Sequence, residues 1–163
     1  MAEPNVAYHH TQTGYVILGG FAIGLLIIVL GYRSVGNTAT PAAARTAILA
    51  TVTTVAIVVA IVSLIFSTLT IEIADGELRW YFTARFIRGS VPLRDIEGAT
   101  QVRSSPAYGW GLRKTPEGTL YCVSGLDAIR LKTRDGRVIN LGTDEPAKLL
   151  AAIQNATPAV NSR

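Results

Sequence analysis

The sequence predicts an α+β membrane protein in which two transmembrane helices precede a small antiparallel β-barrel or sandwich capped by a C-terminal α-helix. Three observations predict this fold class. Two long runs in the first half contain no charged residue. The second half changes to an alternating apolar and polar pattern with Asp-Gly turns at Asp75-Gly76 and Asp135-Gly136. A short amphipathic stretch then closes the chain.

The distribution of charged residues divides the chain into an apolar first part and a second part of mixed charge. Between Gly14 and Ile71 the only charged residues are Arg33 and Arg45, whereas residues 72–163 hold 13 Lys/Arg and 10 Asp/Glu. The formal net charge of +4 is scattered and forms no basic stripe, so nucleic acid is not an expected partner. We therefore predict an N-terminal tail at 1–14, a transmembrane hairpin at 15–68, a folded domain at 69–156 and a C-terminal tail at 157–163.

The hairpin is predicted from two apolar spans, at 15–32 and 46–68, joined by a loop at 33–45. A helix needs about 20 apolar residues to cross a hydrocarbon core, and both runs are close to that length. Neither span contains Asp, Glu, Lys or His, so neither offers a residue for a proton relay or an ion path. The tail lacks the basic segment of a secretory signal, which favours an uncleaved anchor.

Small residues recur along both spans at helical spacing. In a bilayer, such residues allow two helix backbones to approach closely. They either pack the two spans of one chain on each other or join two copies of the protein. The residues concerned are Gly20, Gly24 and Gly31 on the first span and Ala56 and Ala60 on the second.

The two Asp-Gly turns predict hairpins of different length. A two-residue turn at Asp75-Gly76 pairs Ile73 with Leu78 and places the apolar side chains of both strands on one face. At Asp135-Gly136 the apolar pattern instead requires a three-residue turn beginning at Arg134, with Gly136 in the left-handed region. That register pairs Leu131 with Ile139 and Ile129 with Leu141. The closing helix follows from Pro146, with an apolar stripe formed by Pro146, Leu149, Leu150 and Ile153.

No catalytic or metal-binding set is predicted. Gly109 and Gly111 lack the third glycine of a dinucleotide fingerprint, and we interpret them as a bend that enters a strand. Cys122 is interpreted as a small buried side chain, because the only histidines, His9 and His10, lie before the membrane spans. We therefore expect no enzyme activity, no cofactor and no small-molecule substrate.

The segment from Gly109 to Ile153, containing "GWGLR", "YCVSG", "AIRL" and "DGRVINLGTDEP", resembles the bacterial pleckstrin-homology-like domain. Proteins of that family carry a two-helix hairpin before the domain, as this sequence does. The resemblance implies a barrel-plus-helix fold and a non-catalytic role in interaction or assembly. It also implies a multi-pass protein of the inner (plasma) membrane with a cytoplasmic domain, although the two loop arginines alone favour the opposite orientation.

Two functions are consistent with these features. The first is a scaffolding module that acts through protein contacts or self-association, with an interaction surface formed by Tyr108, Trp110, Arg113 and Lys114. The alternative is a sensor of anionic lipid headgroups. Basic side chains near an anionic leaflet contribute about 1 kcal/mol each, although an ordinary solvated strand face explains the same residues. The possible headgroup contacts are Arg79, Arg85, Arg88 and Arg94.

Overall fold

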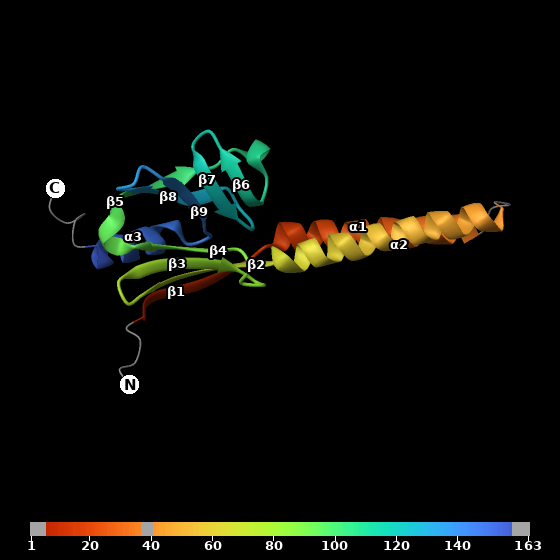
Figure 1. Cartoon of the computed structure of the whole chain (residues 1–163), viewed down its shortest axis with the longest axis horizontal. Helices are drawn as coiled ribbons and strands as arrows, with labels where there is room; N and C mark the ends of the chain where they lie inside the picture. The colour runs from red at the N-terminus through yellow and green to blue at the C-terminus, as the bar shows by residue number, and fades with distance from the viewer. Residues whose placement is uncertain (1–5, 37–40, 158–163) are drawn as a thin grey trace.

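A computed structural model describes residues 6–36 and 41–157 and shows two β-sheets, a C-terminal helix and a projecting pair of long helices (Figure 1). The elements in chain order are β1 (Val6–Thr13), α1 (Tyr15–Gly36), α2 (Ala42–Ile65), β2 (Thr68–Ala74), β3 (Glu77–Phe82), β4 (Arg88–Pro92), η1 (Leu93–Asp95), β5 (Ile96–Arg103), η2 (Pro106–Tyr108), β6 (Gly111–Thr115), β7 (Gly118–Cys122), β8 (Asp127–Thr133), β9 (Val138–Gly142) and α3 (Pro146–Ala156).

The strands form two separate sheets. One has the order β1-β2-β3-β4 and the other the order β5-β8-β9-β7-β6, in which only β7 and β9 are parallel. The α+β class is as expected, and of the two predicted arrangements, barrel or sandwich, the barrel is not formed, because no strand pairing within the described residues joins the two sheets. Helix α3 supplies the reason. It contacts β1, β5 and β8 and buries Leu149 and Ile153, so a helix seals the core where barrel closure would need another strand pair.

Strand β1 is the main departure from the sequence prediction. The structure pairs residues 6–13, which the prediction treats as part of a tail, with β2, with one register shift between Val6 and Tyr8. The buried and half-buried positions of this strand include Tyr8, His10 and Gln12, which are polar or amphipathic. An apolar alternation is therefore missing, and the strand has no periodic signal that the sequence would reveal. Of the predicted C-terminal tail, all residues after Thr157 lie outside the described part.

The helical hairpin is inserted between two paired strands. Only Gly14 separates β1 from α1, and only Phe66 and Ser67 separate α2 from β2. The amide of Gly14 donates a hydrogen bond of 2.7 Å to the carbonyl of Ser67. A Cβ at Gly14 would lie 3.1–3.2 Å from carbonyl oxygens of Phe66, Ser67 and Val123, so the two chain crossings are tightly packed. The helices thus emerge directly from one sheet.

Both helices are long and apolar enough to cross a membrane. With 22 and 24 residues at 1.5 Å per residue, α1 and α2 span about 33 and 36 Å. In their most apolar stretches, almost no residue is fully buried. The second helix begins earlier than predicted, at Ala42, and ends at Ile65 because Thr68 already belongs to β2.

Both hairpin registers are confirmed. Strands β2 and β3 pair Ile73 with Leu78, and the turn residues Asp75 and Gly76 both have positive φ, of 53° and 78°. This is the conformation that a two-residue type I′ turn requires. Strands β8 and β9 pair Leu131 with Ile139, and Gly136 has φ 80° in the longer turn.

The core lies between the two sheets. Its largest fully buried side chains include Leu69, Ile71, Ile73, Leu78 and Phe82 from the first sheet and Ile129, Leu131 and Leu141 from the second. Trp80 packs edge to face against Tyr121 across the sheets, with ring centroids 5.4 Å apart. Gly89 lies directly over the indole, because a Cβ there would fall 2.3 Å from the Trp80 ring.

Candidate functional site

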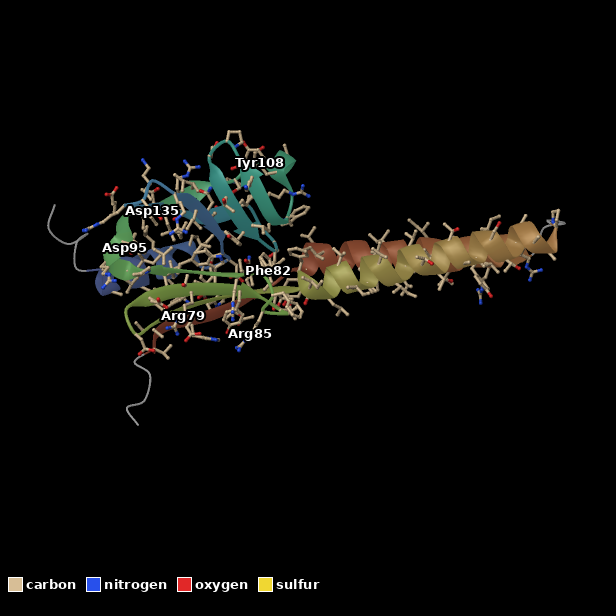
Figure 2. All side chains as sticks on the ribbon, viewed as in Figure 1. Arg79, Phe82, Arg85, Asp95, Tyr108 and Asp135 are labelled. Carbon is tan, nitrogen blue, oxygen red and sulfur yellow. The ribbon has the colours of Figure 1, made fainter. Side chains whose placement is uncertain are left out.

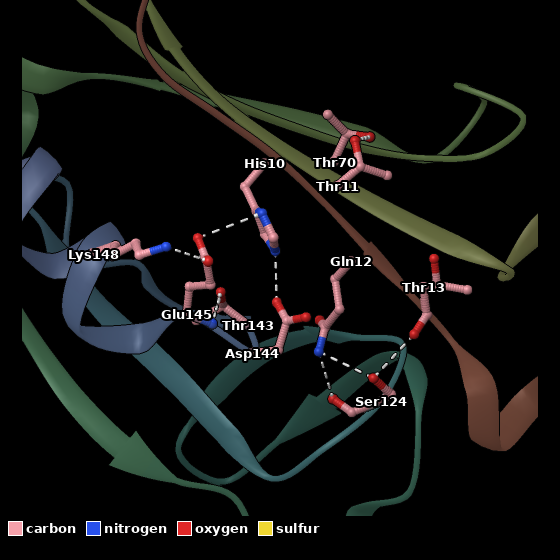
Figure 3. A network of polar contacts seen from close by, with 10 residues as sticks. All are labelled: His10, Thr11, Gln12, Thr13, Thr70, Ser124, Thr143, Asp144, Glu145 and Lys148. Carbon is pink, nitrogen blue, oxygen red and sulfur yellow. Dashed lines mark hydrogen bonds and ion pairs between the residues drawn. The ribbon is translucent and has the colours of Figure 1, made fainter.

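A polar junction joins β1 to the start of α3 (Figure 3). The Nε2 atom of His10 lies 2.6 Å from a carboxylate oxygen of Asp144, and its Nδ1 atom lies 3.6 Å from Glu145. Glu145 also pairs with Lys148 at 2.6 Å, which ties the first turn of α3 into the same group. Burial, followed by the nearby charges of Glu145 and Asp144, raises the pKa of Tyr8 to about 12.

A second set of hydrogen bonds fixes the other half of β1. The side-chain amide of Gln12 donates to the hydroxyl of Ser124 at 3.0 Å, and that hydroxyl donates to the carbonyl of Thr13 at 3.2 Å. The hydroxyls of Thr11 and Thr70 lie 2.8 Å apart on the paired strands. A hydrogen bond of this kind contributes about 1 kcal/mol net, so the junction holds β1 against both sheets and α3.

These contacts engage side chains that would otherwise be candidates for metal binding or catalysis. His10 is engaged by two carboxylates, and within the described residues no group of three or more His, Cys, Asp or Glu side chains is arranged to hold a metal ion. Cys122 is 3% exposed and donates to the carbonyl of Ser124 at 3.3 Å. Burial raises the pKa of its thiol from 9.0 to about 11. We therefore interpret the polar junction as a structural contact that holds β1 on the domain.

Three of the predicted arginines gather on the outer face of the first sheet. Arg79, Arg85 and Arg88 line one hollow of about 500 Å³ together with Glu72, Trp80, Tyr81, Gly89 and Ser90. Cross-strand pairing brings them together, because Arg79 lies opposite Ser90 and Tyr81 lies opposite Arg88. Figure 2 shows Arg79 and Arg85 pointing away from the second sheet. We call this site the basic hollow.

The three arginines differ in how their charge is compensated. Arg79 donates to Glu77 at 2.9 Å. Arg85 instead lies over the ring of Tyr81, with its guanidinium carbon 4.6 Å from the centroid. Among the residues that the structure describes, no carboxylate pairs with Arg85 or Arg88. These two side chains are exposed and carry the available positive charge of the hollow.

Arg94 does not join this group. It follows β4 in η1 and lies 3.9 Å from the carboxylate of Asp95, 83% exposed. Asp95 is at the end of the domain farthest from the long helices (Figure 2). Arg94 lines a separate hollow there with Asp75, Gly76 and Glu77.

The predicted interaction surface lies on the second sheet, in η2, in β6 and in the residues between them. Tyr108 ends η2, Trp110 is 37% exposed, and Arg113 and Lys114 are exposed on β6. The structure adds two exposed apolar side chains, Phe86 and Leu112, that the sequence reasoning missed. An isolated apolar residue in a loop or on an edge strand has no periodic signal, and only its place in the fold reveals its exposure.

The small residues of the helices separate into two groups. Partly buried positions on α1 follow heptad spacing at Ile17, Phe21, Gly24 and Ile28, and those on α2 include Val52, Ala56 and Ala60. Gly20 and Gly31 are exposed, and a Cβ at Gly20, Gly24 or Gly31 would meet nothing within 4 Å.

Comparisons with protein-family models, with curated proteins and with solved structures found no match to this chain.

The buried thiol makes a testable prediction about its ionisation. Burial raises the pKa of Cys122 to about 11, so the ultraviolet absorbance of its thiolate, taken as the difference between the wild type and Cys122→Ser, should appear near pH 11 in the folded protein and near pH 9 in the denatured chain. The folded thiol ionises at higher pH than the unfolded one, so its contribution to stability is present below pH 9 and is lost as the pH rises toward 11. A difference absorbance that titrates near pH 9 in the folded protein would contradict this assignment.

Proposed function

We propose that the protein is a membrane-anchored, non-catalytic module of the pleckstrin-homology-like kind, and that its basic hollow binds anionic lipid headgroups. The observation that carries the proposal is the grouping of Arg85 and Arg88, free of carboxylate partners in the described residues, next to the point where the helices enter the domain. The resemblance in the sequence and the two long apolar helices support the same class of protein.

The hollow lies at the correct level for a headgroup. The loop that carries Arg85 is tied to the residues that follow α2: the amide of Thr83 donates to Thr68 at 3.2 Å, and the hydroxyl of Thr83 lies 2.8 Å from that of Ser67. If α2 ends at the edge of the hydrocarbon core, these residues lie in the headgroup layer, which is about 5–8 Å thick on each side. Arg85 and Arg88 then meet phosphates from the side.

The arginine residues provide a direct test. In neutral detergent, short-chain phosphatidylglycerol should raise the Tm of the full-length protein more than phosphatidylcholine does. Arg85→Gln/Arg88→Gln should weaken this binding about 30-fold, since each basic side chain contributes about 1 kcal/mol. The effect should decline with added salt because the side chains are exposed.

A matched control uses two arginines at the far end of the domain. Arg94→Gln/Arg134→Gln removes the same charge, and Arg134 lies beside Asp95, where its amide donates to the Asp95 carbonyl. This variant should bind like the wild type. Equal stabilisation by both lipids, or equal losses in the two double variants, would rule out the basic hollow as a headgroup site.

Self-association is a second candidate, which one observation favours. Gly20 is exposed on α1, and the space next to its Cα is open, so this side of the helix is free to meet another copy of α1. A scaffolding role through protein contacts would follow from such an assembly.

Substitutions at two neighbouring glycines distinguish self-association through Gly20 from nonspecific contact between helices. Crosslinking of the protein in bilayers should give a dimer that Gly20→Leu abolishes, because a larger side chain prevents close backbone approach. Gly19→Leu adds the same bulk at an equally open position about 100° around the helix and should leave the dimer intact. A strictly monomeric wild type would remove this candidate.

A further inference from the structure

Exposed apolar side chains on the folded domain are few and are concentrated at one end. Outside α1 and α2, the large apolar side chains that are exposed in the described part of the chain are Val6, Phe86, Trp110 and Leu112. Val6 begins β1 at the end distant from the helices. The other three border the helix exit, and Phe86 is 89% exposed.

Phe86 lies at the tip of the β3–β4 loop, which is fastened to the exit of α2. The amide of Phe82 donates to the carbonyl of Ile87 at 3.0 Å and closes the loop. The hydroxyl of Thr83 accepts a hydrogen bond of 2.9 Å from the amide of Thr68, the first residue of β2. The phenyl ring is therefore held beside the membrane end of α2 with almost its whole surface free.

Trp110 and Leu112 border the same exit from the second sheet. Between them, Gly111 is buried against Phe66, and a Cβ at Gly111 would lie 3.7 Å from the Phe66 ring. Phe66 is the residue that directly follows α2. The indole Nε1 of Trp110 donates to the carbonyl of Gly125 at 3.3 Å, which satisfies its polar edge and leaves the ring partly exposed.

These side chains have the chemistry of the membrane interface. Aromatic residues are enriched at the headgroup level, where an apolar ring and a polar edge are both satisfied. Single exposed apolar residues are common on soluble surfaces, but here three lie next to the point where the apolar helices leave the domain. Basic side chains, favourable next to anionic lipid, flank them: Arg85 and Arg88 beside Phe86, and Arg113 and Lys114 beside Leu112.

We propose that Phe86, Trp110 and Leu112 insert into the interfacial layer of the leaflet through which the helices enter, and so fix the orientation of the domain on the bilayer. The inference rests on the proposed function in one respect, that α1 and α2 cross a bilayer. It does not depend on headgroup binding in the basic hollow. The partner is the lipid surface, and contacts from both sheets on either side of the helix pair prevent the domain from tilting.

The two tryptophans allow a direct measurement. Trp80 is 2% exposed in the core, so the difference in emission between the wild type and Trp110→Phe reports Trp110 alone. In nanodiscs of neutral lipid, this difference signal should be blue-shifted relative to water. Lipids brominated near the carbonyl groups should quench it, and they should do so more strongly than lipids brominated at the chain end.

Variants of the other two residues test the shared insertion. Phe86→Ser and Leu112→Ser should each reduce the quenching of Trp110, whereas Val6→Ser, which changes an exposed apolar residue at the opposite end, should not. Emission as in water without quenching, from protein that co-elutes with nanodiscs, would overturn the inference while membrane anchoring stands. Protein that fails to enter nanodiscs would overturn both. If the wild type shows no preference for phosphatidylglycerol while the quenching is intact, only the headgroup proposal would be overturned.

Discussion

The antiparallel pairing of β1 with β2 is the contact on which the rest of the structure depends. These strands precede α1 and follow α2, so their pairing brings both ends of the helical hairpin to neighbouring positions on one sheet. One residue, Gly14, connects β1 to α1, and two connect α2 to β2. A flexible linker is therefore missing at this junction in the described structure, and the orientation of the helices follows from that of the sheet.

The contacts that hold β1 on the domain are largely polar. Hydrogen bonds of Gln12 with Ser124, and the pairing of His10 with Asp144, connect the strand to the second sheet and to α3. An apolar strand before two apolar helices would lengthen an already aggregation-prone segment. Polar inward contacts instead make docking of β1 dependent on the folded domain, because their partners lie more than 100 residues away in the sequence.

The sequence predicted what periodicity and turn chemistry determine locally. The two apolar helices, the Asp75-Gly76 and Asp135-Gly136 registers and the stripe on α3 were predictable because each depends on neighbouring residues. Strand β1 was not, since its inward positions carry Tyr8, His10 and Gln12. The sequence also left a barrel and a sandwich open as alternatives, because whether α3 or another strand seals the core depends on contacts distant in sequence.

The candidate site was predictable only in part. Three arginines on β3, on β4 and in the loop between them come together, while Arg94 lies at the opposite end because β4 runs away from the helix exit before Arg94 is reached. The sequence did not single out Phe86 and Leu112, since their location next to the helix exit depends on which ends of the strands meet that exit. Position relative to the helix exit is a property of the assembled sheets, and no local pattern encodes it.

Sided labelling tests the central claim, that β1–β2 pairing places the N-terminal strand and the domain at the same end of a membrane-crossing hairpin. Single cysteines at His9, Arg94 and Ala42, each exposed, would be introduced with Cys122→Ser and treated with a membrane-impermeant maleimide in sealed vesicles of uniform orientation. The structure predicts that positions 9 and 94 label from the same side and position 42 from the other. Opposite labelling of positions 9 and 94, or equal access to all three, would contradict it.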